Sequence, residues 1–276
     1  MKLRVFVLSN DDLTSNLVFA PLFASEAIDV VGLAFTSTLL GRRRGGAFAH
    51  TLLLLRRTDR RYWAFQVFVN GALKLRDLLP GRRATIPSLR RLCAEHGIEA
   101  SSSANFSAPD FVDVLRHAKP DLIVIRINQL LSSDVLELAS HGVWCVHSSI
   151  LPAYGGIAAE LQGLANGEHE VGTTIFRVTE ELDAGVLLVQ HALSLAADAS
   201  LFSAIVANNE AAGALLKSTI EALAAAGTIE RDLVNPPHSP SYYSWPTRAD
   251  VRRLHTQSRK IMRVGEAARY LRALVR

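Results

Sequence analysis

Short apolar runs alternate with helix-like segments along the first half of the chain. Four runs are apolar enough to form buried strands: residues 2–8, 29–36, 121–125 and 143–147. Four other segments space their apolar residues as amphipathic helices do: 14–25, 84–96, 110–118 and 133–140. A short strand is also expected over residues 99–103. Such alternation is typical of a parallel sheet with helices on both faces.

The second half continues the pattern and then departs from it. Two more apolar strands are expected at 171–178 and 186–195, followed by a long Ala/Leu-rich helix over 201–226 that ends at Gly227. We therefore expect an α/β, Rossmann-like domain over residues 1–227, with a mostly parallel sheet. Residues 37–83 interrupt the alternation and predict a basic helical insertion. Residues 228–276 form a short C-terminal extension.

Composition excludes several classes of protein. The chain has 276 residues, of which 49% are hydrophobic and 20% charged, enough for a large core without a stabilising metal or disulfide. Its two cysteines, Cys93 and Cys145, exclude a disulfide framework and a four-thiolate zinc site, and no metal site is expected. The first residues lack the apolar core of a signal peptide, so we expect a cytoplasmic protein.

Charge is distributed unevenly along the chain. The net charge of +4 comprises +9 over residues 42–83, +7 over 231–276 and −12 over the remainder. The segment 42–83 also carries aromatic side chains, and several partners suit it: an acidic carrier protein, an anionic membrane surface or a second copy in a homo-oligomer. The basic segments could equally lie against the acidic body. The sequence does not choose between these alternatives.

Candidate chemistry gathers where the predicted strands end. Ligands bind open parallel sheets at the carboxyl ends of their strands. Cys145 and His147 are two residues apart on one strand and so face the same side. A carboxylate-rich loop follows at 180–185, and a His that meets an Asp moves protons near pH 7. Each residue also has an ordinary structural role, and the spacing alone leaves the choice undecided.

Four ordered blocks favour the catalytic alternative: VHSSILP at 146–152, YGG at 154–156, GTTIF at 172–176 and ELDAG at 181–185. The chain over 84–227 resembles the folate-dependent formyltransferase family, whose members include methionyl-tRNA formyltransferase, glycinamide ribonucleotide transformylase and sugar N-formyltransferases. In that family an Asn-x-His precedes Ser-Leu-Leu-Pro, and a Leu-Asp-x-Gly follows later.

The resemblance implies transfer of a formyl group from 10-formyltetrahydrofolate to an amine of a small metabolite, in secondary metabolism or sugar modification. His147 then manages protons, Asp183 is its partner, and Cys145 faces the formyl carbon. The pterin ring is expected against the loops at 126–131 and 179–182. The residues expected to bind this cofactor are Arg126, Asn128, Gln129, Leu130, Leu131, Thr179, Glu180 and Leu182. Arg126 has an alternative role as the partner of a local carboxylate.

Cys145 departs from the family pattern, because it stands where the family has Asn. A thiol is a weak hydrogen-bond donor, so it supplies little of the stabilisation that an amide gives to a developing oxyanion. Three outcomes follow. Other donors compensate and formyl transfer persists. Cys145 acts as a nucleophile, which makes the protein an acyltransferase or hydrolase. Or the site is catalytically disabled and serves as a folate-type binding or scaffold protein.

Two further departures concern the acceptor. The first turn, Ser9–Asp12, carries two carboxylates where ribonucleotide-using members have a phosphate-binding glycine loop. We expect an acceptor without phosphate there, or a cationic amine, unless Asp11 or Asp12 merely caps a helix. The 49 residues after Gly227 are too few for the C-terminal barrel of the tRNA-acting members. Transfer RNA is therefore not expected as a partner, and the aromatic residues at 242–247 are expected to pack against the protein.

Overall fold

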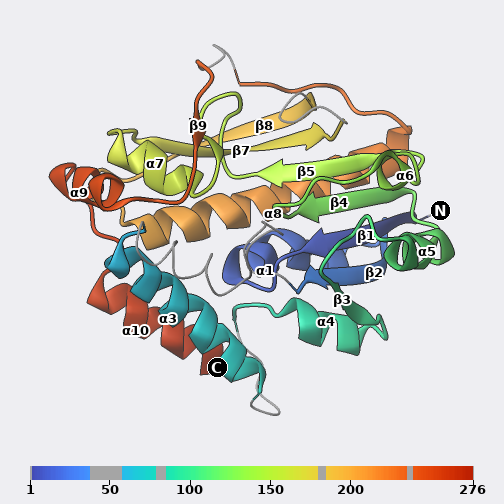
Figure 1. Ribbon diagram of the computed structural model, residues 1–276, viewed down its shortest axis with the longest axis horizontal. Coiled ribbons are helices and arrows are strands. Elements are labelled where there is room, and N and C mark those ends of the chain that lie inside the picture. The colour runs from blue at the N-terminus through green and yellow to red at the C-terminus, as the bar shows by residue number, and fades with distance from the viewer. Residues whose placement is uncertain (1, 38–57, 79–84, 180–184, 235–238, 276) are drawn as a thin grey trace.

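The computed structural model describes residues 2–37, 58–78, 85–179, 185–234 and 239–275. At its centre lies a seven-stranded sheet (Figure 1). In spatial order the strands are β3 (Ala100–Ser103), β2 (Ile28–Thr36), β1 (Leu3–Ser9), β4 (Leu122–Arg126), β5 (Val143–His147), β7 (Glu170–Arg177) and β8 (Val186–Ser194). The first five strands are parallel, whereas β7 and β8 run antiparallel to their neighbours. The expected mostly parallel, Rossmann-like sheet is confirmed.

Helices cover both faces of this sheet (Figure 1). Those of the main body are α1 (Leu13–Phe19), α4 (Leu89–Glu95), α5 (Pro109–Ala118), α6 (Ser133–Leu136), α7 (Ala159–Ala165) and α8 (Leu201–Ala226). One core cluster joins the sheet to α1 and α8, and another joins it to α5 and α6. We call these the α8 side and the α5 side of the sheet.

The period of two in β5 determines which side each residue faces. Trp144 and Val146 belong to the α8-side cluster and are almost completely buried. Val143 and Cys145 pack with the α5-side cluster, and Cys145 is only half-buried. His147 follows Cys145 in the same alternation and is also half-buried. The strand therefore presents its thiol and its imidazole to one side, as the spacing predicted.

The strand order reverses between β1 and β4. From β1 the chain continues outward to β2 and β3, whereas β4 leads to β5 on the other side. Ligands of open α/β sheets bind at the carboxyl ends of strands beside such a reversal. Ser9 pairs with Arg126 at these ends, and Cys145 pairs with Ile125 on the next strand. The carboxyl ends of β1, β4 and β5 therefore lie next to one another at the same end of the sheet.

Some predicted helices are shorter than their patterns suggested. The helix expected over 84–96 begins only after Ser88, whose hydroxyl caps it, because Pro87 disfavours helical backbone before it; residues 79–84 lie outside the described residues. The helix expected over 133–140 ends at Leu136. The segment expected over 14–25 changes to a 3₁₀ helix at Ala20–Ala24, which contains Pro21. The short helix α7 was not predicted.

The basic insertion and the C-terminal segment pack against each other. The described part of the insertion is α3 (Arg60–Asp77), which lies beside α10 (Val264–Val275) (Figure 1). Trp63 of α3 stacks on Trp245, with ring centres 5.9 Å apart. Phe65 and Phe68 contact Phe202 and Tyr270. The aromatic side chains of α3 are therefore used inside the molecule; residues 42–57 are outside the described residues.

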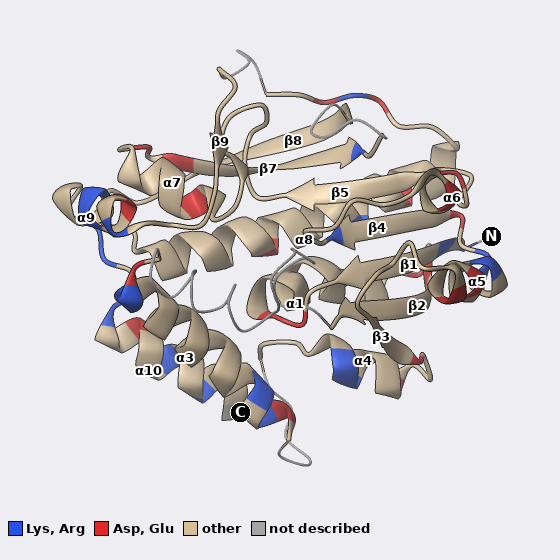
Figure 2. Cartoon of the chain, viewed as in Figure 1, with Lys and Arg blue, Asp and Glu red and all other residues tan. Residues whose placement is uncertain are grey.

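The C-terminal segment also reaches back to the main body. Its strand β9 (Tyr242–Tyr243) pairs with β6 (Gly155–Gly156), and Tyr243 stacks on Tyr154. The helix α9 (Arg248–Thr256) follows and contacts α7. Lys and Arg residues are frequent on α3, α9 and α10 (Figure 2). Tyr243 and Trp245 pack against the protein as expected, whereas Tyr242 is exposed. Within the described residues, no helix has both the length and the apolar character needed to span a bilayer.

Candidate active site

The imidazole of His147 lies at the carboxyl end of β5 and is bound by the loop that follows. Its Nε2 is 3.2 Å from the backbone oxygen of Tyr154. A carbonyl oxygen only accepts hydrogen bonds, so this contact requires the proton on Nε2. In the neutral ring Nδ1 then carries the lone pair.

Buried polar side chains of β7 and β8 fix the loop after His147. The Thr174 hydroxyl donates to the Ser149 carbonyl at 2.6 Å and accepts from the Leu151 amide at 2.9 Å. The Gln190 amide donates to the Leu151 carbonyl at 2.7 Å. Thr174 and Gln190 are both buried, so these bonds are shielded from competing water. The loop that holds the imidazole is therefore rigidly supported.

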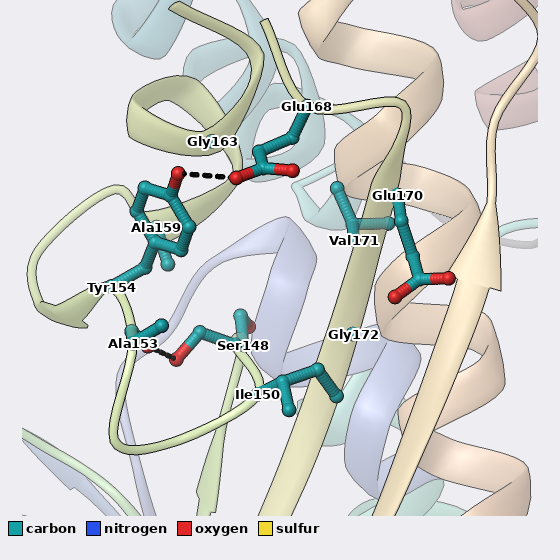
Figure 3. Close-up of a pocket in the computed structure, with 11 residues that line it drawn as sticks. Ser148, Ile150, Ala153, Tyr154, Ala159, Gly163, Glu168, Glu170, Val171 and Gly172 are labelled. Atoms are coloured by element: carbon teal, nitrogen blue, oxygen red, sulfur yellow. Dashed lines mark hydrogen bonds between the residues drawn. The ribbon is translucent and has the colours of Figure 1, made fainter. Parts of the chain in front are cut away.

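A pocket is lined in part by this loop (Figure 3). It is lined by loop residues, by one side of α7 and by the start of β7: Ser148, Ser149, Ile150, Ala153, Tyr154, Ala159, Gly163, Glu168, Glu170, Val171 and Gly172. The Tyr154 hydroxyl donates to Glu168 at 2.8 Å, and burial raises the pKa of Tyr154 to about 12. The pocket thus shares a wall with the loop that binds His147.

Arg126 occupies the end of β4 next to this loop. Its guanidinium donates to the Ser148 hydroxyl at 2.7 Å and to the Val146 carbonyl at 3.5 Å. Within the described residues no carboxylate lies within 4.0 Å of it, so the alternative of a local ion pair finds no partner there. The cation instead touches the residues immediately before and after His147.

The loop after β4 holds four other residues that were expected to bind the cofactor. Asn128 and Leu130 are exposed, Leu130 by 68%, and Leu131 is half-buried against the α5-side core. Gln129 is different. Its amide donates to the Thr36 hydroxyl at 3.1 Å, and its oxygen accepts from the Phe106 backbone at 3.3 Å. Gln129 therefore anchors the loop, while the side chains of Asn128 and Leu130 are exposed on either side of it.

The expected carboxylate loop lies largely outside the described residues. Glu180, Leu182 and Asp183 belong to this undescribed part, so the pairing of Asp183 with His147 stays a prediction. Its described flanks are Thr179 and Gly185. A side chain at Gly185 would collide with the ring of Phe176, and Phe176 pairs with Cys145 across β5 and β7. The described end of the loop thus lies one strand from the thiol.

Both carboxylates of the first turn have local partners. Asp12 caps α1, accepting from the Ser15 amide at 2.8 Å and from the Thr14 hydroxyl at 2.8 Å. Asp11 forms an ion pair with Arg90 at 2.8 Å. The helix-capping alternative is therefore confirmed for Asp12.

Sequence reasoning missed the buried polar residues behind the loop. Glu160 of α7 accepts hydrogen bonds from Asn208 and Asn209 of α8, and all three side chains are buried. A signal was present, because two adjacent asparagines are unfavourable inside an Ala/Leu-rich helix unless tertiary contacts use them.

Comparison with known proteins identifies the family. Residues 65–217 match the model of the formyl transferase family. The chain belongs to this family. It is 35% identical over 119 residues to a methionyl-tRNA formyltransferase of Geobacter metallireducens, covering 43% of this chain and 38% of that relative. It is 32% identical over 133 residues to the Kosmotoga olearia methionyl-tRNA formyltransferase, covering 47% and 43%. The formyl transferase chain thus spans about two fifths of the curated relatives it matches.

Solved structures share the fold. The glycinamide ribonucleotide transformylase 1 of Symbiobacterium toebii superposes with a TM-score of 0.55 at 16% identity, over 84% of this chain and 95% of that one. A sugar 3N-formyl transferase, crystallised in the presence of dTDP and 5-N-formyl-THF, superposes with a TM-score of 0.55 at 12% identity, over 95% and 80%. These likenesses support the formyltransferase fold across most of the chain.

One expectation about partners is wrong. The shortness of the C-terminal segment was used to exclude transfer RNA, yet the curated relatives above are methionyl-tRNA formyltransferases. Their similarity lies in segments of 119 to 133 residues. The exclusion of transfer RNA from the length of the C-terminal segment is therefore withdrawn.

Proposed function

We propose that this formyl transferase moves a formyl group from 10-formyltetrahydrofolate to an amine of a small metabolite. The observation that carries the proposal is the placement of His147 and Cys145. They face one side of β5 at its carboxyl end, inside the family-matched segment and beside the reversal of strand order.

In the proposed reaction, a C–N bond forms between the acceptor amine and the formyl carbon. The bond between that carbon and the N10 nitrogen of the folate breaks. The amine loses one proton and N10 gains one, so atoms and charge balance. His147 accepts the proton at Nδ1 and returns it to the leaving nitrogen. Asp183 stabilises the imidazole while it is charged.

Cys145 borders the formyl carbon in this proposal without bonding to it. A thiol donates weakly to a developing oxyanion, so the reaction depends on other donors or proceeds more slowly than with an amide at this position. The covalent alternative uses Cys145 as a nucleophile. It requires an acyl group on that sulfur during turnover, which mass spectrometry of the quenched protein detects.

The loop after β4 supports the donor side. Exposed Leu130 presents an apolar surface of the kind that flat heterocycles contact, and exposed Asn128 supplies an amide beside it. Arg126 and Leu131 flank these residues, and Gln129 anchors the loop. We propose that Thr179, Glu180 and Leu182 also contact the donor.

The domain limits are part of the proposal. Residues 1–227, with the insertion at 37–83, form the catalytic domain, and residues 228–276 form its extension. In support, α8 ends at Gly227 in a left-handed conformation, φ = 73°, which stops the helix. The contacts of α3 with α10 and of β6 with β9 give the extension a stabilising role.

The test is an acceptor panel with purified protein and 10-formyltetrahydrofolate. Amino sugar nucleotides, amino acids and methionyl-tRNA serve as separate acceptors, and the N-formyl product is measured by mass spectrometry. We expect a formylated small amine, and a loss on the order of 10²–10⁴ in rate for His147→Ala. Full activity of His147→Ala, or no consumption of donor with any acceptor, would overturn the proposal. Transfer to methionyl-tRNA alone would overturn its small-molecule part.

A further inference from the structure

Buried polar side chains form a continuous chain behind the candidate active site. It begins at Arg126, whose guanidinium donates to the Ser148 hydroxyl at 2.7 Å. That hydroxyl contacts the Asn209 side-chain oxygen at 3.4 Å, and the Asn209 amide donates to the Glu160 carboxylate at 3.2 Å. The chain thus connects β4, the loop after β5, α8 and α7, with a cation at one end and a carboxylate at the other.

This chain occupies the α8 side of the sheet. By the alternation of β5, the imidazole and the thiol face the α5 side. Arg126 also donates to the Val146 carbonyl. Its guanidinium therefore holds the residues on both sides of His147 from behind, while the ring is held by the Tyr154 carbonyl.

Burying these groups is costly unless they are used. Ser148, Glu160 and Asn209 are 8%, 6% and 0% exposed. A buried carboxylate and buried amides destabilise a fold unless hydrogen bonds satisfy them, and a fully satisfied network fixes geometry. An apolar contact between α7 and α8 would avoid that cost. The polar chain instead leads to the residues on either side of His147, and fixing their position is a role that would account for the cost.

We propose that Glu160 and Asn209 are positioning residues for His147. Glu160 orients the Asn209 amide, and Asn209 orients the Ser148 hydroxyl. Ser148 then directs the Arg126 guanidinium onto the Val146 carbonyl, immediately before His147. The catalytic consequence rests on the proposed function, whereas the effect on the imidazole does not.

Asn208 provides a matched control. It is 1% exposed, neighbours Asn209 in α8, and donates to the same Glu160 oxygen at 3.1 Å. Its side-chain oxygen accepts from the Thr173 hydroxyl rather than contacting Ser148. Loss of either Asn removes one bond to Glu160, but only loss of Asn209 disconnects Glu160 from Ser148.

The experiment compares Asn209→Ala with Asn208→Ala. We expect similar decreases in melting temperature. Asn209→Ala should lower kcat on the order of tenfold to a hundredfold with KM for the donor unchanged, because misplacing a catalytic group acts on the chemical step. Asn208→Ala should keep kcat within about twofold, a change too small to indicate displacement of a catalytic group. Equal kcat values in the two variants would overturn the proposal.

Ser148 gives a second comparison, which decides the matter if Asn209→Ala does not fold. Ser148→Ala removes the hydroxyl that joins Arg126 to Asn209, whereas Ser148→Thr retains a hydroxyl. We expect Ser148→Ala to lose activity as Asn209→Ala does and Ser148→Thr to recover most of it. Equal activities of the Ala and Thr variants would contradict the proposal.

A measurement without substrate separates this inference from the proposed function. The imidazole signal of His147 is assigned in NMR spectra by its absence from His147→Ala. We expect its position to change in Asn209→Ala and to stay in Asn208→Ala. If it changes while no variant transfers formyl groups, the positioning role stands and the proposed function fails. If it is the same in both variants, the positioning role is wrong even where formyl transfer is observed.

Discussion

The two sides of the sheet at the end of β5 differ in how deeply their polar side chains are buried. On the α5 side, Cys145 and His147 are half-buried, as groups that meet a substrate must be. On the α8 side, Asn209 and Glu160 are buried and bonded to one another. The reacting groups are thus accessible, while the groups that fix their backbone are shielded from water. A search confined to exposed polar residues would find only the first set.

Glu160 lies at one end of the buried polar chain. Removing its carboxylate should have the largest effect on stability of the changes that distinguish the two sides. Glu160→Ala leaves the side-chain amide of Asn208 without its acceptor, whereas the Asn209 amide still donates to the Ile205 carbonyl at 2.7 Å. Each unsatisfied buried donor costs about 1–3 kcal/mol. We expect one loss of that size in the free energy of unfolding, measured by urea denaturation. The activity per folded molecule should fall as well.

Glu210→Ala is the control for that change. Glu210 follows Asn209 in α8 but is exposed, so its removal should change the free energy of unfolding by less than about 0.5 kcal/mol. Equal losses in the two variants would mean that Glu160 contributes no more than a surface carboxylate.

Restoring the family's amide sharpens the comparison from the accessible side. Cys145→Asn supplies the donor that the family places beside the formyl oxygen. Because one such donor is worth on the order of 10²–10³ in rate where it has been removed elsewhere, we expect kcat to be preserved or raised. The measurement is steady-state formyl transfer with the best acceptor of the panel.

The covalent alternative predicts the opposite result for the same variant. If Cys145 attacks the formyl carbon, Cys145→Asn removes the nucleophile and activity is lost. Cys145→Ser is the control for side-chain size, because serine is close to cysteine in size but also lacks the thiol. A large loss in both variants would favour the covalent route.

Local patterns predicted the parts of the molecule that depend on nearby residues. The strand at 143–147 was predicted with its bounds, and its alternation correctly placed Cys145 and His147 on one side. Contacts between distant residues leave no such pattern. Glu160 and Asn209 are 49 positions apart, and Trp63 stacks on Trp245 from the far end of the chain. Neither pairing follows from periodicity, because each depends on how whole elements pack.

The smallest expected effect concerns the two cysteines, which lie in different parts of the fold. Cys93 of α4 is 1% exposed, and burial raises its pKa to about 11. Since the thiolate is the reactive form, Cys93 should react very slowly with iodoacetamide near neutral pH. Cys145 is half-buried near the carboxyl end of β5, so it should be alkylated first, as peptide mapping after partial labelling would reveal. Bound folate should slow the alkylation of Cys145 and leave the alkylation rate of Cys93 unchanged, because the proposed donor site borders only the Cys145 thiol. Equal protection of both cysteines would instead indicate that folate stabilises the whole fold, and it would contradict the proposal that Cys145 borders the donor site.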